Sequence, residues 1–404
     1  MSNKDGLVFC SRHTSNARTT RPDFSQQLAL AVSGGLTKGD LFWRDHKEWL
    51  EEHGYILRSR YHPGWKPSWT GTKKAPYKCE DGPMPYKQMD ARRISDGTIV
   101  VLKRVDARDP SNPELKMGPL FSTEPLASDP RNHCIPIYET LSLPNTNEEV
   151  LLVMPCLKEW YFPSFDTIGE SYGILPPDFR GMGSLFVLFQ IIHLLSTQGL
   201  QFIHSLHIAH NDIKYNNIMM DSSPLYDQPM HPVDRYRTYD WKRKPKPKTR
   251  TRRPVKYYYI DFDLCEKYDP AKAPGYGGDK SVPEYEYPDR MCDPFAVDVY
   301  HLGNVLRMQI VGGAPNRELP RNPAFTFMQP LIDDMTQDDP EKRPKMDQVV
   351  SQFSDIVAGM SQWQLRSPIW QDNSFRGRFV KKPLHWCRHL YNMITRVPAI
   401  PTPK

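Results

Sequence analysis

The sequence predicts an α+β fold in two lobes, a small β-rich lobe followed by a larger α-helical lobe. Strand-like patterns rich in β-branched residues lie between residues 91 and 154, whereas helical patterns dominate from residue 184 onward. The chain has 404 residues, which is enough for a two-lobed core with extensions. We expect an N-terminal extension over 1–76, a first lobe over 77–156, a second lobe over 157–358 and a tail over 359–404.

Cysteine usage and hydropathy limit the classes of protein to which the chain can belong. The chain has seven cysteines, an odd number, and no pair has the CxxC spacing, so neither a disulfide framework nor a structural zinc site is expected. The most apolar stretch, residues 184–203, contains Gln190, His193 and other polar residues, which favours a buried helix over a membrane span. The N-terminus has no apolar signal segment. We therefore expect an intracellular protein of the cytoplasm or nucleus, without a membrane partner.

The first half of the chain predicts a helix and several strands. Asp40 is a possible cap of a helix that ends at Gly54. Residues 91–105 predict a hairpin with Asp96-Gly97 in its turn. Residues 134–141 and 150–154 predict two further short strands.

The segment His210-Asn-Asp-Ile-Lys-Tyr-Asn-Asn217 carries the clearest chemical pattern of the chain. Within this segment, Asp212 offers a carboxylate, Lys214 a positive charge and Asn217 an amide. An ordinary surface turn has the same residue types, so this segment is weighed together with those that follow it.

Two other segments supply groups of the same kind. Asp261-Phe262-Asp263 follows the apolar stretch 257–260, which places an aspartate at the end of a predicted strand. Lys103 ends Val-Val-Leu-Lys in the predicted hairpin. Taken alone, the first is a strand-end turn and the second a solvated lysine; their order along the chain gives them weight.

Together, these segments resemble the catalytic loop, the D-F-G motif and the V-A-I-K strand of protein kinases. Lys214, two residues after Asp212, resembles the Ser/Thr type. The resemblance covers about residues 82–350 and implies a bilobal protein-kinase-like fold that binds ATP and Mg²⁺. The chain also resembles fungal protein kinase domain-containing proteins that have no assigned substrate, in the segments that begin at Gly54 and Asn132.

The resemblance implies a role for each matching residue. Asp212 would be the catalytic base, Lys214 would neutralise the γ-phosphate, and Asn217 and Asp261 would bind magnesium. Lys103 would anchor the nucleotide, paired with a glutamate. Glu114 fits the local pattern of that glutamate and Glu124 fits the distance to the next strand; we favour Glu114 and leave both open. The remaining nucleotide contacts implied are Gly82, Val101, Met154, Cys156 and Leu157.

Three further residues would support the scaffold. Asp298 resembles the helix aspartate that braces the backbone of the catalytic loop. Glu284, after Pro283, resembles the end of an activation segment, and Arg343 resembles the late arginine that pairs with it. We therefore expect a partly buried ion pair between Glu284 and Arg343.

The sequence departs from the family pattern at four places. No G-x-G-x-x-G precedes Lys103, and only Gly82 stands at the expected distance. Val101 replaces the small residue beside adenine. Asn211 replaces the arginine of H-R-D, so control through a phosphorylated activation loop is not expected. Asp263 replaces the glycine of D-F-G and adds a carboxylate near the predicted metal ligands.

A basic insert lengthens the stretch between Asp212 and Asp261. It spans about residues 222–254, and its composition predicts an exposed, extended loop. Residues 242–256 carry nine Lys or Arg and no acidic residue, whereas the whole chain has a net charge of +6. The segment from Lys242 to Lys256 is a candidate site for an acidic or nucleic-acid partner or a nuclear localisation signal; a solvated loop is the plain alternative.

Three hypotheses follow. The leading one is a Ser/Thr protein kinase acting on an unidentified protein substrate, because all the charged groups that the chemistry requires are present. The second is a pseudokinase scaffold or regulator with weak or no transfer, because the glycine loop is missing and D-F-G reads D-F-D. The third is a nucleic-acid-associated protein that uses the basic insert.

Overall fold

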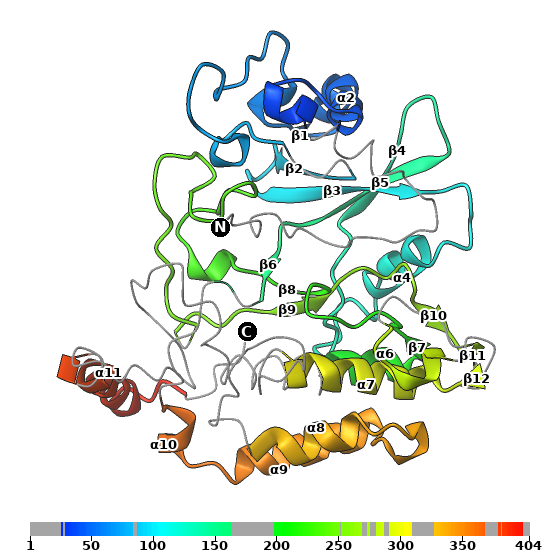
Figure 1. Ribbon diagram of the computed structural model, residues 1–404, viewed down its shortest axis with the longest axis vertical. Coiled ribbons are helices and arrows are strands. Elements are labelled where there is room, and N and C mark those ends of the chain that lie inside the picture. Colours follow the sequence, from blue (N-terminus) through cyan, green and yellow to red (C-terminus); the bar gives the residue numbers. More distant parts are fainter. Residues whose placement is uncertain are drawn as a thin grey trace. The chain divides into compact units, whose positions relative to one another are not determined.

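The computed structural model describes residues 26, 29–83, 87–160, 162, 198–250, 252–268, 273–274, 280–286, 291–308, 327–367, 379–380 and 382–398. The fold is α+β: a curled antiparallel sheet of five strands, three small sheets, and helices (Figure 1). The chain divides into two compact units. The first comprises residues 1–122, 135–156 and 226–246, and the second comprises the rest. Among the described helices, none is long and apolar enough to cross a membrane.

The first unit is built on the five-stranded sheet, in the order β1-β2-β3-β5-β4. Every neighbouring pair is antiparallel. The strands are β1 (Tyr55–Ile56), β2 (Gln88–Arg93), β3 (Ile99–Asp106), β4 (Glu139–Ser142) and β5 (Glu149–Pro155). The register sets Val101 of β3 opposite Met154 of β5 and Lys103 opposite Leu152. Because side chains alternate along a strand, Val101 and Lys103 share one face of the sheet, and Leu102 lies on the other.

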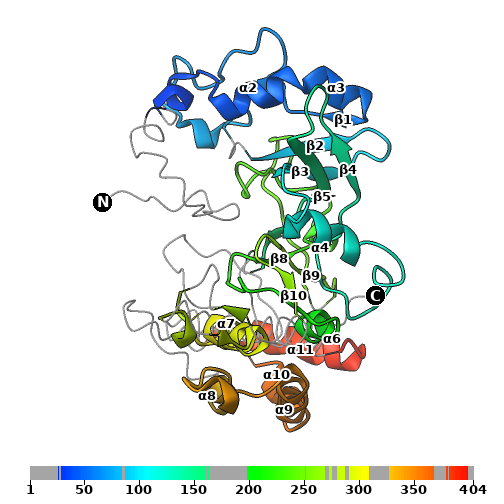
Figure 2. The ribbon, with the colours of Figure 1, turned by 90° about the vertical axis from the view of Figure 1, so that its right-hand side faces the viewer.

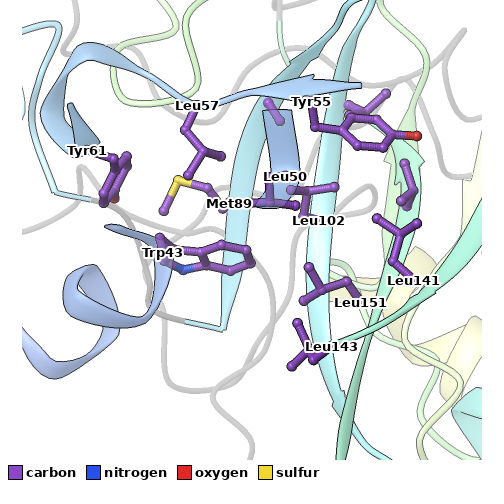
Figure 3. Close-up of a cluster of buried hydrophobic side chains, with 13 residues drawn as sticks. Trp43, Leu50, Tyr55, Leu57, Tyr61, Met89, Leu102, Leu141, Leu143 and Leu151 are labelled. Atoms are coloured by element: carbon purple, nitrogen blue, oxygen red, sulfur yellow. The ribbon is translucent and has the colours of Figure 1, made fainter. Parts of the chain in front are cut away.

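Two short helices cover the face that carries Leu102. They are α2 (Lys38–Asp45) and α3 (Lys47–Glu52), seen beside β1 in Figure 2. Trp43 of α2 and Leu50 of α3 are fully buried against Met89 and Leu102 (Figure 3). A fully buried Leu or Trp side chain contributes roughly 1.5–3 kcal/mol or more to folding. The predicted N-terminal extension and the sheet therefore share one hydrophobic core.

The start of α2 differs from the prediction. Thr37, not Asp40, is the N-cap: its hydroxyl accepts from the Asp40 N–H, and Asp40 accepts from the Thr37 N–H in return. This is a capping box, in which two side chains satisfy the free donors of the first turn. Asp40 also forms a buried ion pair with Arg60 at 2.9 Å. The predicted end at Gly54 is confirmed, with φ of +90°, and the helical stretch is divided at His46.

The predicted hairpin is confirmed as β2 and β3. Gly97 lies in its turn with φ of +72°, a backbone conformation that glycine adopts without a steric penalty. Helix α4 (Pro113–Phe121) follows β3 and is capped by Asn112, whose side chain accepts from the Glu114 N–H. Pro113 stands at the first helical position, where no N–H is required. Glu114 is therefore fixed in the first turn of α4.

Part of the basic insert folds as an element of the first unit. Residues 229–239 form a small hairpin in which Met230 pairs with Thr238, and residues 230–233 are buried. The prediction of an exposed, extended loop is therefore wrong for this part. The apolar run Met230-His-Pro-Val233 supplies the buried side chains, and a composition dominated by neighbouring lysines and arginines obscured it. The prediction holds better for residues 242–248, where every Lys and Arg is exposed.

The described residues of the second unit form helices and three two- or three-stranded sheets. Its strands are β6 (Lys158–Glu159), β7 (Ile208–Ala209), β8 (Ile218–Met220), β9 (Tyr257–Tyr259), β10 (Glu266–Lys267), β11 (Ala273–Pro274) and β12 (Met291–Cys292). Its helices are α6 (Gln201–Ser205), α7 (Pro294–Leu306), α8 (Gln329–Met335), α9 (Met346–Ala358), α10 (Gln362–Leu365) and α11 (Lys382–Ile394). Helix α8 packs on α7 and on α9 (Figure 1).

Two features of this unit position the segments that carry chemistry. Strands β8 and β9 pair antiparallel, which brings the end of the 210–217 segment beside the strand that precedes Asp261. Gly303 of α7 lies so close to α8 that an added Cβ would come within 2.8 Å of the Met335 side chain.

The helix predicted over 184–203 lies outside the described residues except for its end, which continues as α6.

Candidate functional site

The segment His210–Asn217 forms a tightly bonded loop in the second unit. Asp212 is buried, and its Oδ2 lies 2.7 Å from the Lys214 Nζ and accepts from the Asn217 Nδ2 at 2.8 Å. The same amide nitrogen donates to the Asp212 carbonyl at 2.9 Å. Within the described part of the chain, the other carboxylate oxygen, Oδ1, has no hydrogen-bond partner. One oxygen of Asp212 is therefore held in place, and the second remains an available acceptor.

A buried aspartate of α7 holds the backbone of this loop. Asp298 accepts from the His210 N–H at 2.7 Å and from the Asn211 N–H at 2.8 Å. His204 lies 3.0 Å from the same carboxylate. Burial raises the pKa of Asp298, but hydrogen bonds and charge from His204 and His210 outweigh burial and lower it, so the ionised form is favoured. The bracing role predicted for Asp298 is confirmed.

Asn211 has a structural role in this chain. Its backbone has a positive φ of 61°, and its side-chain amide donates to the Leu264 carbonyl at 2.8 Å and to the Tyr268 hydroxyl at 3.0 Å. Asparagine tolerates the left-handed conformation better than most residues do. Asn211 therefore ties the loop to the residues that follow Asp263.

The Asp261-Phe262-Asp263 segment lies beside the same loop. His210 Nε2 contacts the Ile260 carbonyl at 3.2 Å, and its ring packs between those of Tyr259 and Phe262. Asp261 is buried and has a positive φ of 70°, which is strained for a residue with a side chain. A carboxylate oxygen of Asp261 lies within 4.8 Å of one from Asp263.

The donor chemistry of these residues fits magnesium. Mg²⁺ prefers oxygen ligands, above all carboxylates. Asp261 and Asp263 offer carboxylates, and Asn217 offers an amide oxygen that also accepts from Asn216 at 3.1 Å. A carbonyl oxygen has two lone pairs, so the bond from Asn216 leaves capacity for one metal contact.

A second scaffold interaction joins the segment between α8 and α9 to the residues that precede α7. Arg343 makes two parallel hydrogen bonds to the Glu284 carboxylate, at 2.7 and 2.8 Å. The guanidinium also donates to the Gln337 and Ala296 carbonyls. The predicted Glu284–Arg343 ion pair is confirmed, and its bidentate geometry belongs to the strong class of charge-assisted hydrogen bonds.

The first unit contains the residues predicted to contact a nucleotide, except for Leu157. Lys103 forms an ion pair with Glu114, so the open choice between Glu114 and Glu124 is resolved for this structure. Both side chains are largely buried. Val101 is half-buried on the same face as Lys103, opposite the buried Met154, and Cys156 follows half-buried after β5. Leu157 is buried at the start of the next segment of the second unit.

Gly82 has a packing role in this structure. Its N–H donates to the Cys79 carbonyl at 3.1 Å, and its carbonyl accepts from the Arg58 Nη1 at 3.0 Å. An added Cβ would come within 2.6 Å of the Pro76 carbonyl oxygen. The position therefore requires glycine, but its backbone N–H is already used within the protein.

Sequence reasoning missed a polar cluster on the face that carries Val101 and Lys103. Asp90 of β2 stands directly opposite Val101 and is fully buried. Its carboxylate accepts from the Arg58 Nε at 3.0 Å and from the Tyr239 hydroxyl of the insert hairpin at 3.1 Å. Burial and the charge of Asp90 raise the pKa of Tyr239, so its hydroxyl keeps its proton. The alternation Gln88-Met-Asp-Ala was the available signal, because it directs Asp90 away from the hydrophobic core.

No family model and no curated protein matches the chain.

Proposed function

We propose that the chain is a protein kinase of the Ser/Thr type with a bilobal protein-kinase-like fold, transferring the γ-phosphate of ATP to protein hydroxyl groups. The observation that carries the proposal is the asymmetry of the Asp212 carboxylate. Oδ2 is held by Lys214 and Asn217, whereas Oδ1 is buried and has no partner among the described residues. A fixed carboxylate with one available oxygen is suited to orient a hydroxyl and to accept its proton.

The roles of the other residues follow from their charges. Lys214 neutralises charge on the transferred phosphoryl group, and Lys103, oriented by Glu114, contacts the other phosphates. Asn217 and Asp261 would hold magnesium, with Asp263 as an additional carboxylate. Bound magnesium neutralises charge on the phosphates, and Asp298 keeps the loop that carries Asp212 in position. The protein substrate is defined here only as a bearer of Ser or Thr hydroxyls.

A second candidate function is that of a pseudokinase, a regulator that binds partners with little or no phosphotransfer. Two observations favour it. The N–H of Gly82 is used within the protein, and the Asp90–Arg58–Tyr239 cluster occupies part of the sheet face that carries Val101 and Lys103. Both would weaken nucleotide binding relative to a site with a glycine-rich loop.

Phosphotransfer measured with radiolabelled ATP on a broad panel of Ser- and Thr-containing peptides separates the two candidates. We expect transfer by the natural chain and a loss of about 10²–10⁴-fold in Asp212→Asn, which retains size and polarity but cannot accept the proton. Asp355→Asn, an exposed aspartate of α9, is the matched control and should leave transfer unchanged. If Asp212→Asn transfers phosphate as fast as the natural chain, the role of Asp212 is refuted. If the natural chain transfers phosphate to no peptide of the panel, the pseudokinase candidate is favoured.

A further inference from the structure

Helix α11 presents its apolar side to solvent and its polar side to the protein. Three polar residues of this helix are buried: His385, His389 and Asn392. They are spaced by four and by three positions, so they lie on one face. On the opposite face, Leu384 is 69% exposed and Ile394 is 79% exposed. Leu390 and Tyr391 complete this exposed stripe, and Cys387 lies within it. A helix on a globular protein ordinarily buries its apolar face, so this arrangement is inverted.

Specific contacts fix the inverted orientation. His385 Nε2 contacts the Arg366 carbonyl at 2.9 Å, and Asn392 Oδ1 accepts from the Arg252 Nη2 at 3.0 Å. Burial lowers the pKa of His385 to about 4 and that of His389 to about 3, with help from neighbouring positive charges. The buried face is therefore polar but uncharged at neutral pH, and the apolar stripe stays outward.

One basic side chain contacts the stripe, and further basic residues close to it in the sequence are exposed. The Arg252 guanidinium lies 5.3 Å from the centre of the Tyr391 ring, so the end of the basic insert contacts α11. Lys248, Arg252, Arg253 and Arg396 are exposed. From residue 362 to the C-terminus, the sequence contains eight Lys or Arg and one acidic residue, Asp372.

We propose that α11 and the adjoining basic residues form a surface that binds the interface of a membrane containing anionic lipids. A helix with Leu, Ile and Tyr on one face and basic residues at its flanks is the pattern of helices that lie in the headgroup region. Anionic lipids attract such basic segments. Binding at the surface requires no membrane-spanning helix, so the proposal agrees with the helix lengths described above, but it replaces the expectation from the sequence that the chain has no membrane partner.

The same observations argue against two other binding partners for this surface, a second copy of the chain and nucleic acid. A second copy of the chain would bring two positively charged surfaces together, which is unfavourable at close range. Nucleic acid would use the arginines and lysines but not the aliphatic stripe, because its contacts are mainly to phosphates. Only a surface that is both anionic and apolar matches the whole arrangement.

The test is flotation of the full chain with vesicles of phosphatidylcholine alone or with 30% phosphatidylserine. We expect binding to the anionic vesicles, weakened by high salt, and at least about tenfold weaker partitioning to phosphatidylcholine. Leu384→Ser combined with Ile394→Ser should reduce binding about tenfold or more, as should Lys248→Gln combined with Arg253→Gln. Ile94→Ser, which alters an exposed isoleucine in the β2–β3 turn, is the matched control and should bind like the natural chain.

Four results would overturn the proposal. The first is that the natural chain does not bind anionic vesicles. The second is that the Leu384→Ser and Ile394→Ser changes leave vesicle binding unchanged, which would reduce the interaction to charge alone. The third is a dimer in sedimentation experiments that those two changes dissociate, which would assign the stripe to a second copy. The fourth is binding of double-stranded RNA at vesicle-like affinity that the same changes weaken.

Discussion

At the scale of single residues, the two oxygens of the Asp212 carboxylate have different environments. Lys214 and Asn217 engage Oδ2, whereas Oδ1 is buried and without a partner among the residues described. An unpartnered buried acceptor is unfavourable by about 1–3 kcal/mol in an ordinary protein, and more if it is charged. Such an oxygen is tolerated where a bound substrate donates the missing hydrogen bond. The proposed activity therefore depends on Asp212.

Tyr239 leads to a prediction about stability. Its hydroxyl donates to the fully buried Asp90, which also pairs with Arg58. Tyr239→Phe removes only that donor and leaves a buried carboxylate short of one partner, so we expect a loss of about 1–3 kcal/mol of folding free energy. Urea denaturation measures it. Tyr236→Phe, an exposed tyrosine of the same hairpin, should change the free energy by less than about 0.5 kcal/mol. Equal stabilities of the two variants would contradict this account of the insert.

At the scale of elements, α7 supports the loop that carries Asp212. Asp298 accepts two backbone N–H groups at once, from His210 and Asn211, and an amide side chain has only one oxygen to replace its two. We expect Asp298→Asn to leave one of these buried N–H groups without its bond, to destabilise the protein by about 1–3 kcal/mol, and to reduce phosphotransfer through loss of loop geometry. Thermal denaturation and the radiolabel assay measure the two effects. An active enzyme of unchanged stability would refute the bracing role.

Helix α2 gives a prediction about pH. Burial raises the pKa of Asp40, but the hydrogen bond and charge of Arg60 and the bonds from Thr37 outweigh it, so the pKa lies below its usual 3.8. A group whose folded pKa is lowered contributes stability above its unfolded pKa, and that contribution is lost as the pH falls through the folded pKa. We expect Asp40→Asn to lower stability at pH 7 and to flatten the decline in stability below about pH 4. An identical acid profile in both proteins would show that Asp40 contributes nothing.

The elements also show what the sequence could predict. The β2–β3 hairpin, the end of the first helical stretch at Gly54, the Asp298 brace and the Glu284–Arg343 pair follow from local signals or from motif order, and the structure confirms them. The Asp90–Arg58–Tyr239 cluster joins residues from three distant parts of the chain. No local pattern encodes such a contact, because the fold brings its members together only after the insert hairpin packs on the sheet.

The insert shows why composition alone wrongly predicted an exposed, extended loop over its whole length. Nine basic residues lie between 242 and 256, and the eight of them within the insert dominate its charge, but the preceding segment 229–239 buries Met230 and Val233 and forms a hairpin. A disordered loop lacks enough apolar residues to offset the entropy of ordering, and this short segment has them. Sequence averages over about thirty residues therefore hid the difference between the folded segment 229–239 and the exposed basic segment 242–248.

At the scale of the whole molecule, the proposed function uses residues from both units. Lys103, Glu114 and Val101 belong to the first, and Asp212, Asn217 and Asp261 belong to the second. Helix α11 lies more than 100 residues after Asp261, and none of these groups belongs to it. Changes in α11 should therefore alter vesicle binding and leave phosphotransfer in solution unchanged.

The most direct test of the central claim is the thermal stability of the chain with and without magnesium and ATP. A ligand present at about 100 times its Kd stabilises the folded state by about 2.7 kcal/mol, which raises the Tm by a few degrees for a protein of this size. We predict a rise that requires magnesium and is lost in Lys103→Ala and in Asp261→Ala, but is kept in Asp355→Asn. No rise at millimolar ATP, or a rise that survives both substitutions, would contradict the proposed nucleotide site.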